Sequence, residues 1–249
     1  MKKFIYLLIW VSFLFSYQNF RVYTYGIKLN YKEYKNSKVI DRDYSSFSDL
    51  LGVGIKYKTV FNKILFDVKV EYASGNSIYE GVTWSGKPLK MKQSDVSILD
   101  IEASLGYKYF YFLVGYREWN RGSSGYEGDY NEIYYWPYFG IKSNYKFGFK
   151  NFYFSPEIAY IYAINPEIKI ELGNYPVLSL GDTDGGYITL PFVMKFSNFN
   201  IDFFYRFEYW HISSSKPGLL IVDGEGYVIY EPESITKNQY LGAGFTYKF

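Results

Sequence analysis

Cysteine is absent from the 249-residue sequence, and histidine occurs once, at His211. The lack of cysteine excludes disulfides, thiolate metal sites and a cysteine nucleophile, and a single histidine excludes a zinc site built on two imidazoles. Asp182 and Asp184, followed by glycine, supply too few oxygens for calcium and are typical of a turn. We therefore expect no metal and no other cofactor.

A large excess of one charge is also missing, since 27 Lys and Arg residues face 25 Asp and Glu residues. Loss of Lys2 and Lys3 with a leader leaves 27 − 2 = 25 bases and 25 acids. A nearly neutral chain has no polybasic field for a polyanion. We expect no nucleic-acid partner.

The N-terminus has the pattern of a signal peptide. Met1-Lys2-Lys3 is followed by an apolar run from Phe4 to Phe15, which is too short for a comfortable membrane helix. We expect residues 1–18 to be the signal peptide, with processing near Tyr17 to Asn19, and residues 19–249 to form the mature domain. An uncleaved anchor is the alternative.

Aromatic residues are abundant although the chain is not hydrophobic on average. They make up 23% of the residues, with 31 Tyr and 22 Phe, yet the mean hydropathy is −0.18. Strict alternation reconciles the two numbers, because every second residue then faces lipid and its neighbours face a polar lumen. A soluble sandwich or lipocalin-like barrel also alternates but does not need so many outward rings. The composition predicts an all-β antiparallel transmembrane barrel.

Alternating segments of about a dozen residues recur along the chain, the length a tilted strand needs to cross a bilayer. They are 20–34, 47–59, 63–77, 96–108, 109–121, 133–147, 151–164, 186–197, 199–213 and 239–249. Short connectors near 60–62, 108–109, 148–150 and 197–198 alternate with long ones at 35–46, 78–95, 122–132, 165–185 and 214–236. We expect about ten strands, periplasmic turns, external loops and both termini in the periplasm.

Within each segment the charged residues favour one of the two alternating sets of positions, which we call a parity. Asp67 and Lys69 oppose Phe66 and Val68, and in the first segment we assign Lys28 and Lys32 to the inside. The first segment then has Tyr25, Ile27, Leu29 and Tyr31 outside. The predicted inward charges are Lys28, Lys32, Lys56, Lys58, Asp67, Lys69, Glu71, Asp100, Glu102, Lys142, Glu157, Lys195, Asp202, Arg206 and Glu208. A barrel of this size is narrow, so opposite charges are expected to pair and close the lumen. A narrow or gated solute path is the alternative.

The C-terminal segment Gln239 to Phe249 ends on an aromatic residue. Leu241, Phe245, Tyr247 and Phe249 share one parity, against Gly242, Gly244, Thr246 and Lys248. The segment resembles the closing strand of bacterial outer-membrane β-barrels. The resemblance implies an outer-membrane location and recognition of Phe249 by the barrel assembly machinery, and we expect a monomer among outer-membrane lipid and lipopolysaccharide.

Ten strands with tall external loops resemble the omptin family of outer-membrane proteases in architecture. That family places two acidic residues opposite an Asp and His pair. Here the segment from Tyr79 to Pro88 has no paired acids, and the loop 165–185 has no histidine. We therefore do not expect omptin-type proteolysis.

Two groups of external residues suggest a position at the membrane surface. Lys87, Lys90 and Lys92 lie beside Trp84 and could hold lipopolysaccharide phosphates, although a solvated loop explains them equally well. The residues expected in an outer aromatic girdle are Trp119, Arg121, Tyr134, Tyr135 and Trp136.

His211-Ile-Ser213, with Glu225 fourteen positions after His211, resembles the His, Ser and Glu of the lipid A deacylase family. The resemblance implies Ser213 as nucleophile, His211 as general base and Glu225 as the acid that orients it. The chain departs from that family at Ser214, where Asn is usual, and in placing the acid in a Gly-rich loop. An interfacial histidine is the alternative.

Together these patterns favour a non-enzymatic outer-membrane barrel, structural or surface-binding, with a charged and largely closed lumen. A narrow pore for small solutes and the lipid A deacylase are the alternatives.

Overall fold

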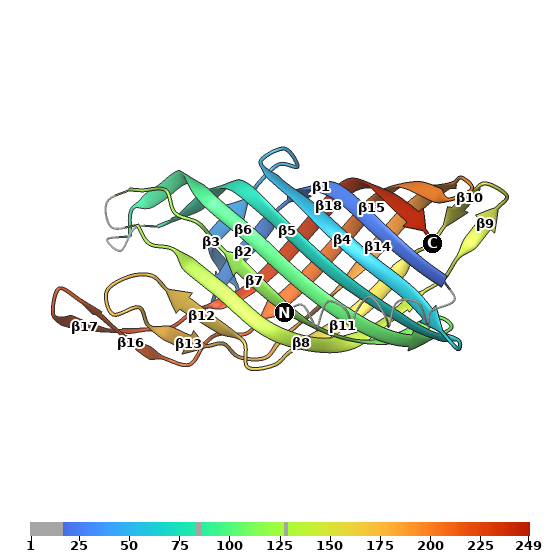
Figure 1. The fold of residues 1–249 in the computed structure, drawn as a ribbon. Coiled ribbons are helices and arrows are strands. Elements are labelled where there is room, and N and C mark those ends of the chain that lie inside the picture. The colour runs from blue at the N-terminus through green and yellow to red at the C-terminus, as the bar shows by residue number, and fades with distance from the viewer. Residues whose placement is uncertain (1–16, 83–85, 127–128) are drawn as a thin grey trace, which may run out of the picture.

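The computed structural model describes residues 17–82, 86–126 and 129–249. Ten antiparallel strands form a closed wall, as the sequence predicted (Figure 1). They are β1 (Tyr17–Lys28), β4 (Leu50–Phe61), β5 (Ile64–Val82), β6 (Pro88–Tyr107), β7 (Phe110–Asn120), β8 (Glu132–Asn144), β11 (Glu157–Ala163), β14 (Thr183–Lys195), β15 (Phe199–Ile212) and β18 (Glu233–Lys248). Among the described residues, no helix is long and apolar enough to cross a membrane.

The first and last strands close the barrel. β1 pairs with β18 from Asn19↔Lys248 to Lys28↔Gln239, and on its other side it pairs with β4. Closure removes both sheet edges, so every wall strand has two hydrogen-bonded neighbours. Residues 239–248 of the predicted closing segment lie in β18, and Phe249 follows the end of the strand.

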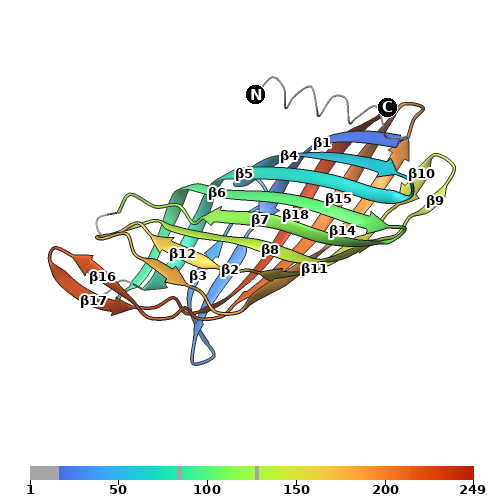
Figure 2. The same ribbon diagram turned by 60° about the horizontal axis from the view of Figure 1, so that its bottom comes forward.

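The two ends of the barrel differ in the length of their connections (Figures 1 and 2). One end carries the C-terminus and short turns, such as the Asn62-Lys63 turn with φ of 46° and 73°, together with β9 (Phe147–Phe149) and β10 (Phe152–Phe154). The opposite end carries β2 (Asn30–Lys35), β3 (Lys38–Tyr44), β12 (Glu167–Ile170), β13 (Val177–Ser179), β16 (Gly218–Val222) and β17 (Glu225–Ile229). By the rule for bacterial barrels, the short turns mark the periplasmic end.

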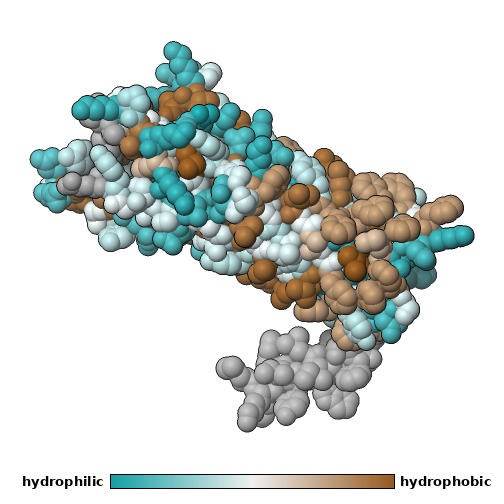
Figure 3. Space-filling model, turned by 90° about the horizontal axis from the view of Figure 1, so that it is seen from above, coloured by the Kyte–Doolittle hydropathy of each residue, from teal (hydrophilic) through white to brown (hydrophobic). Residues whose placement is uncertain are grey.

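Apolar side chains cover the outside of the periplasmic half. Val53, Phe112, Phe203 and Leu241 are exposed there, and hydrophobic residues gather toward that end in Figure 3. Nearer the loops the outward positions become polar, as at Lys28 on β1 and Lys237 on β18. The apolar band is the lipid-facing part of the wall, and the polar part stands outside the membrane.

The sidedness predicted for the first segment was wrong. Tyr25, Ile27, Leu29 and Tyr31 are buried inside the barrel, whereas Lys28 is exposed outside. Lys32 likewise lies on the outer face and is partly exposed. This part of the strand lies beyond the lipid band, so its outer face contacts water. Its apolar side chains therefore face the interior, as they do in a soluble barrel.

Glycines on β4 make room for the inward tyrosines. A Cβ on Gly52 would lie 2.3 Å from the Tyr25 ring, and one on Gly54 would lie 2.3 Å from the Tyr23 ring. Because real Cβ atoms do not approach a ring this closely, both rings depend on glycine opposite them.

Candidate functional site

Apart from Lys28 and Lys32, the predicted lumen charges lie on the inner face of the wall, and most of these are buried. Arg206 on β15 reaches across to Glu71 on β5 with two hydrogen bonds of 2.8 Å, and the Tyr23 hydroxyl donates to the same carboxylate at 2.7 Å. Arg117 on β7 similarly donates to Glu208 on β15 at 2.8 and 3.2 Å. Two-pronged arginine–carboxylate pairs of this kind are geometrically specific, so they fix the distance between opposite walls.

Lysines complete this network nearer the periplasmic end. Lys142 Nζ lies 2.7 Å from Glu102 and 3.0 Å from Asp67, and its side chain is fully buried. Lys69 Nζ contacts Asp100 at 3.2 Å. Two further pairs are Lys56–Glu157 at 3.5 Å and Arg21–Asp202 at 2.5 Å. Each predicted lumen acid therefore has a base across or beside it, which is the condition for tolerating buried charge.

An apolar layer fills the barrel on the external side of these pairs. Trp136 and Trp210 are 1% and 2% exposed, and their ring centroids are 5.2 Å apart. Arg117 lies 5.5 Å above the Trp210 ring, where the charged and apolar layers meet. The layer also contains the inward aliphatic residues Ile27, Leu29, Leu50, Val96, Ile98, Ile161, Ile168 and Ile212. We call it the apolar plug.

Arg121 lies beyond the plug and gathers four carboxylates. It contacts Asp43 at 2.5 Å, Glu33 at 2.9 Å and Asp41 at 3.0 Å, and it also binds Glu132. The second oxygen of Asp43 is buried without a hydrogen-bond partner among the described residues. We call Arg121 with these four acids the Arg121 cluster.

A fifth acid, Glu231, joins the cluster through two tyrosines. Tyr134 donates to Glu231 at 2.5 Å, and Tyr31 lies 3.1 Å from both Glu231 and Glu33. One hydroxyl has a single proton to donate, so it does not satisfy two carboxylates at once. The arrangement therefore favours a proton on one of the two acids.

The girdle assignment was wrong for four of its residues. Trp119, Arg121, Tyr134 and Trp136 are buried inside the barrel, and Trp119 stacks on Tyr134 with centroids 5.0 Å apart. Tyr135 has the outward parity. These residues stand above the lipid band, where large rings fill the interior instead of anchoring the outside.

A cavity of about 520 Å³ lies beside the Arg121 cluster at the external end. Among the described residues that line it, Arg121 is the only base, whereas Glu33, Asp41, Asp129, Glu132 and Glu231 are acids. The remaining lining includes the four tyrosines Tyr79, Tyr126, Tyr130 and Tyr230. We call this cavity the external pocket. It combines an excess of negative charge with aromatic rings.

Burial raises the pKa values of acids in this region, which lies outside the membrane-spanning part of the wall. The pKa of Asp43 is raised to about 7 and that of Glu231 to about 8, in both cases chiefly because burial disfavours the charged form. The charge of Glu132 raises the Glu231 value further, and Arg121 lowers both values. These acids therefore change charge near neutral pH.

The stability of the barrel is expected to fall as pH rises from about 4 to about 8. Asp43 and Glu231 bind protons more tightly folded than unfolded, so the stability they contribute is present below about pH 4 and is lost as pH passes about 7 and 8. The slope is at most about 1.4 kcal/mol per pH unit for each group. Thermal unfolding in detergent across this range measures it. Glu231→Gln should flatten the profile, whereas Glu225→Gln on the exposed β17 should not.

The structure does not assemble the three residues of the deacylase resemblance. His211 Nε2 lies 3.0 Å from Glu233, and His211 Nδ1 lies 3.6 Å from Asp184. Glu225 instead accepts a hydrogen bond from Tyr227 at 2.6 Å within the β16–β17 hairpin. His211 and Ser213 do share the outward parity, as predicted. Both imidazole nitrogens thus face carboxylates that sequence spacing did not suggest.

The predicted lipopolysaccharide contacts lie partly on the outer face of the β5–β6 hairpin, and Trp84 is outside the described residues. Lys90 is 65% exposed on its side chain and pairs with Glu80 at 2.6 Å. Arg42 binds the same carboxylate. Lys87 and Lys92 are exposed. Lipopolysaccharide binding by these lysines stays a prediction.

Phe249, the predicted assembly signal, is exposed at the periplasmic end. Its backbone N–H donates to the Gln18 carbonyl at 3.1 Å, and its ring lies 4.9 Å from that of Tyr247. In the folded barrel the terminal ring therefore stands on the lipid side of the seam. Recognition by the assembly machinery stays a prediction.

Among the described residues, no group of three or more His, Asp or Glu side chains is arranged so that it could hold a metal ion. The acids of the Arg121 cluster were missed in the sequence, although part of the signal was there. Glu132, Tyr134 and Trp136 share the parity of Lys142 on the same strand, which assigns them to the inside. Glu231 precedes β18 in a loop, where no periodic pattern applies.

Neither family models nor curated protein sequences match this chain. Among solved structures, the outer-membrane protease OmpT of Escherichia coli aligns over 94% of this chain and 97% of its own, with 13% identity and a TM-score of 0.54. Neisserial surface protein A aligns over 92% and 97%, with 12% identity and a TM-score of 0.41. OprG of Pseudomonas aeruginosa aligns over 93% and 96%, with 9% identity and a TM-score of 0.32.

The fold is that of a bacterial outer-membrane β-barrel, which confirms the predicted architecture. The closed wall, the apolar outer band and the polar interior all fit this class, and they place the chain in the outer membrane. At such low identity the likeness to OmpT concerns the fold alone.

Proposed function

We propose that the protein is a non-enzymatic outer-membrane barrel that keeps its lumen closed and binds a cationic ligand in the external pocket. The observation that carries this proposal is the continuous filling of the lumen. Paired charges occupy the periplasmic half, and the apolar plug around Trp136 and Trp210 occupies the next layer.

A solute path is the weaker alternative because it requires two costly steps. The pairs between opposite walls, such as Arg206–Glu71, would have to separate inside a medium of low dielectric constant. The two tryptophan rings would also have to part, although they are among the largest fully buried side chains. A pore therefore needs a different arrangement of the same interior.

The chemistry of the external pocket supports a ligand that carries an ammonium or guanidinium group. Its acids exceed its single base, so a bound cation gains attraction that Arg121 does not cancel. The tyrosine rings of the pocket offer faces to which cations are attracted. A basic peptide presents both groups on a flexible backbone, and we take it as the ligand class.

Binding of a tetralysine peptide by calorimetry tests this proposal. The double variant Glu132→Gln/Glu231→Gln removes two pocket acids and should weaken binding about tenfold or more. Asp223→Asn/Glu225→Gln makes the same charge change on the exposed β16–β17 hairpin and should leave binding within about twofold. Affinity should rise with pH as Glu231, whose pKa is raised to about 8, loses its proton. Equal weakening in both variants would show that the pocket is not the site.

The proposal includes the lipid environment of the protein. We propose that outer-membrane lipid and lipopolysaccharide contact the barrel. The exposed side chains of Lys87 and Lys92 on the outside of the wall support this proposal. We also propose that the barrel assembly machinery inserts the protein and that the folded barrel is a monomer.

A further inference from the structure

The periplasmic end of the barrel is basic throughout. Five of the segments at this end contain lysine and lack both aspartate and glutamate, namely 57–66, 103–116, 143–156, 191–201 and 239–249, and the start of β1 contributes Arg21. The external pocket has the opposite excess. Charge is thus separated along the barrel axis, although the whole chain is nearly neutral.

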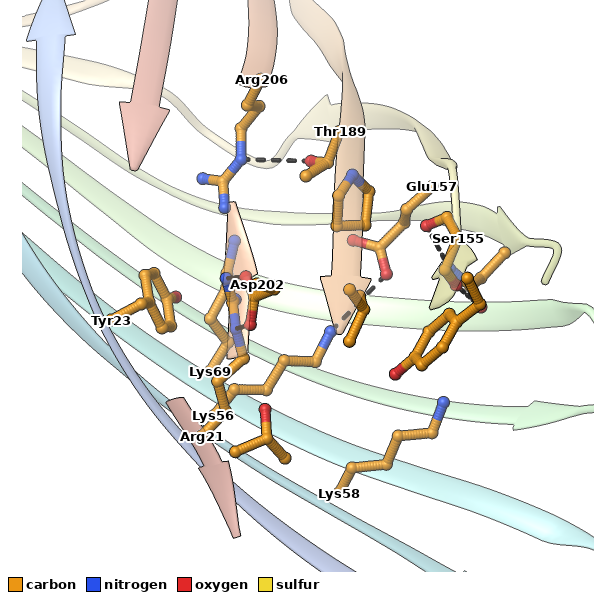
Figure 4. Close-up of a pocket in the computed structure, with 15 residues that line it drawn as sticks. Arg21, Tyr23, Lys56, Lys58, Lys69, Ser155, Glu157, Thr189, Asp202 and Arg206 are labelled. Carbon is orange, nitrogen blue, oxygen red and sulfur yellow. Dashed lines mark hydrogen bonds and ion pairs between the residues drawn. The ribbon is translucent and has the colours of Figure 1, made fainter. Parts of the chain in front are cut away.

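Four of these lysines converge at the mouth of the lumen around Tyr153. Lys146 Nζ lies 3.9 Å from the centroid of the Tyr153 ring, and Lys195 Nζ lies 5.5 Å from it. Tyr153 and Lys58 line a cavity of about 180 Å³ inside this mouth (Figure 4). Lys248, the last residue of β18, acts on Lys146 through its charge.

No carboxylate of the described chain pairs with these four ammonium groups. Lys58 donates to the Tyr111 hydroxyl at 3.2 Å, and Lys248 donates to the Phe196 carbonyl at 3.2 Å. The two acids of the cavity are engaged elsewhere, because Glu157 pairs with Lys56 and Asp202 pairs with Arg21. In Figure 4, Lys56 and Glu157 face each other, while Lys58 extends separately.

The four ammonium groups repel one another, and Lys146 lies in the connection between β8 and β9, outside the membrane-spanning strands. Burial lowers the pKa of Lys146, and the charges of Lys195, Lys248 and Lys58 lower it further. Positive groups held together without a counter-charge attract an anion from solution.

We propose that Lys58, Lys146, Lys195 and Lys248 form a phosphate-binding site at the periplasmic mouth of the barrel. Ammonium groups bind phosphate as mobile point charges, and several of them match its multiple charge better than that of a carboxylate. The phosphate belongs either to a free anion of the periplasm or to a phospholipid headgroup of the inner leaflet. Phe147 and Phe149 are exposed at this end, and their rings can contact the acyl chains of a phospholipid whose headgroup lies at the lysines.

Thermal unfolding of the folded full-length barrel in a neutral detergent tests the site. One arm adds sodium phosphate, with sodium chloride at equal ionic strength as its reference. The other arm adds phosphatidylglycerol, with phosphatidylcholine as its reference, and native mass spectrometry counts the bound lipid. The test variant is Lys146→Gln/Lys195→Gln. Lys63→Gln/Lys150→Gln removes the same charge from exposed periplasmic turns and serves as the matched control.

The wild type and the matched control should be stabilised by phosphate, by phosphatidylglycerol or by both; a response in one arm identifies the source, and a response in both shows that the site takes either. The test variant should lose about tenfold or more in affinity for that ligand. Without ligand the test variant should unfold at a temperature no lower than that of the wild type, because two repelling charges are gone. A lower unfolding temperature without ligand would instead identify a misfolded variant. An equal response in both variants, or none in the wild type, overturns the proposal.

Discussion

Replacement of Arg206 by methionine should lower the free energy of unfolding by about 3–5 kcal/mol, the usual cost of removing one partner of a buried ion pair. The variant leaves Glu71 with the Tyr23 hydroxyl at 2.7 Å and Lys69 at 3.2 Å, but without its two-pronged partner. Lys69 already contacts Asp100 and Glu102, so it is shared too widely to replace the guanidinium. Urea unfolding in detergent micelles, followed by tryptophan fluorescence, measures the loss.

Two further variants separate the pair from its surroundings. Lys90→Met removes one partner of the exposed Lys90–Glu80 pair and should cost less than about 1 kcal/mol. Arg206→Met/Glu71→Met removes both charges and should recover most of the loss, because no uncompensated charge remains in the lumen. If Arg206→Met unfolds at the same urea concentration as Lys90→Met, the Arg206–Glu71 pair does not hold the walls together.

Replacement of Arg121 by methionine should have an effect of similar size, about 3–5 kcal/mol, at the external end of the barrel. Four carboxylates on β2, β3 and β8 then face one another without a base, so the β2–β3 hairpin should separate from β8. Hydrogen exchange followed by mass spectrometry should show faster exchange in residues 30–44. Exchange in β15 and β18 within the lipid band should be unchanged.

Low pH should partly rescue the Arg121→Met variant. Protonation removes the repulsion among the acids: as the pH falls, Glu231, whose pKa is raised to about 8, gains its proton before Asp43, whose pKa is raised to about 7. Arg42→Met, which breaks the exposed Arg42–Glu80 pair, is the matched control and should exchange like the wild type. Equal protection of residues 30–44 in Arg121→Met and wild type would contradict the role given to the cluster.

The strands of the wall could be predicted from the sequence because the alternation of inward and outward side chains is visible within a single strand. Asp67, Lys69 and Glu71 oppose Phe66, Val68 and Val70 on one strand, and both sets lie where this alternation places them. The same rule failed at Tyr25 to Tyr31, because the outside of the barrel changes from lipid to water along the strand. Alternation reveals two faces but does not say which solvent each face meets.

The external pocket was beyond prediction for a different reason. Its acids come from the β2–β3 hairpin, from β8 with the loop before it, and from the segment before β18, which are far apart in the sequence and meet only around Arg121. Glu132 had the correct parity to be found, whereas Glu231 lies in a loop without periodicity. A cluster assembled from four elements needs the register between strands, which composition and spacing do not contain.

The closed lumen is the central claim, and conductance of the purified barrel in a planar lipid bilayer tests it most directly. The account predicts no stable single-channel steps for the wild type. The triple variant Trp136→Ala/Trp210→Ala/Arg206→Glu removes the two large rings of the plug and breaks the Arg206–Glu71 pair. It should begin to conduct. Stable single-channel steps from the wild type that disappear on Glu102→Lys substitution would contradict the closed lumen and establish a pore.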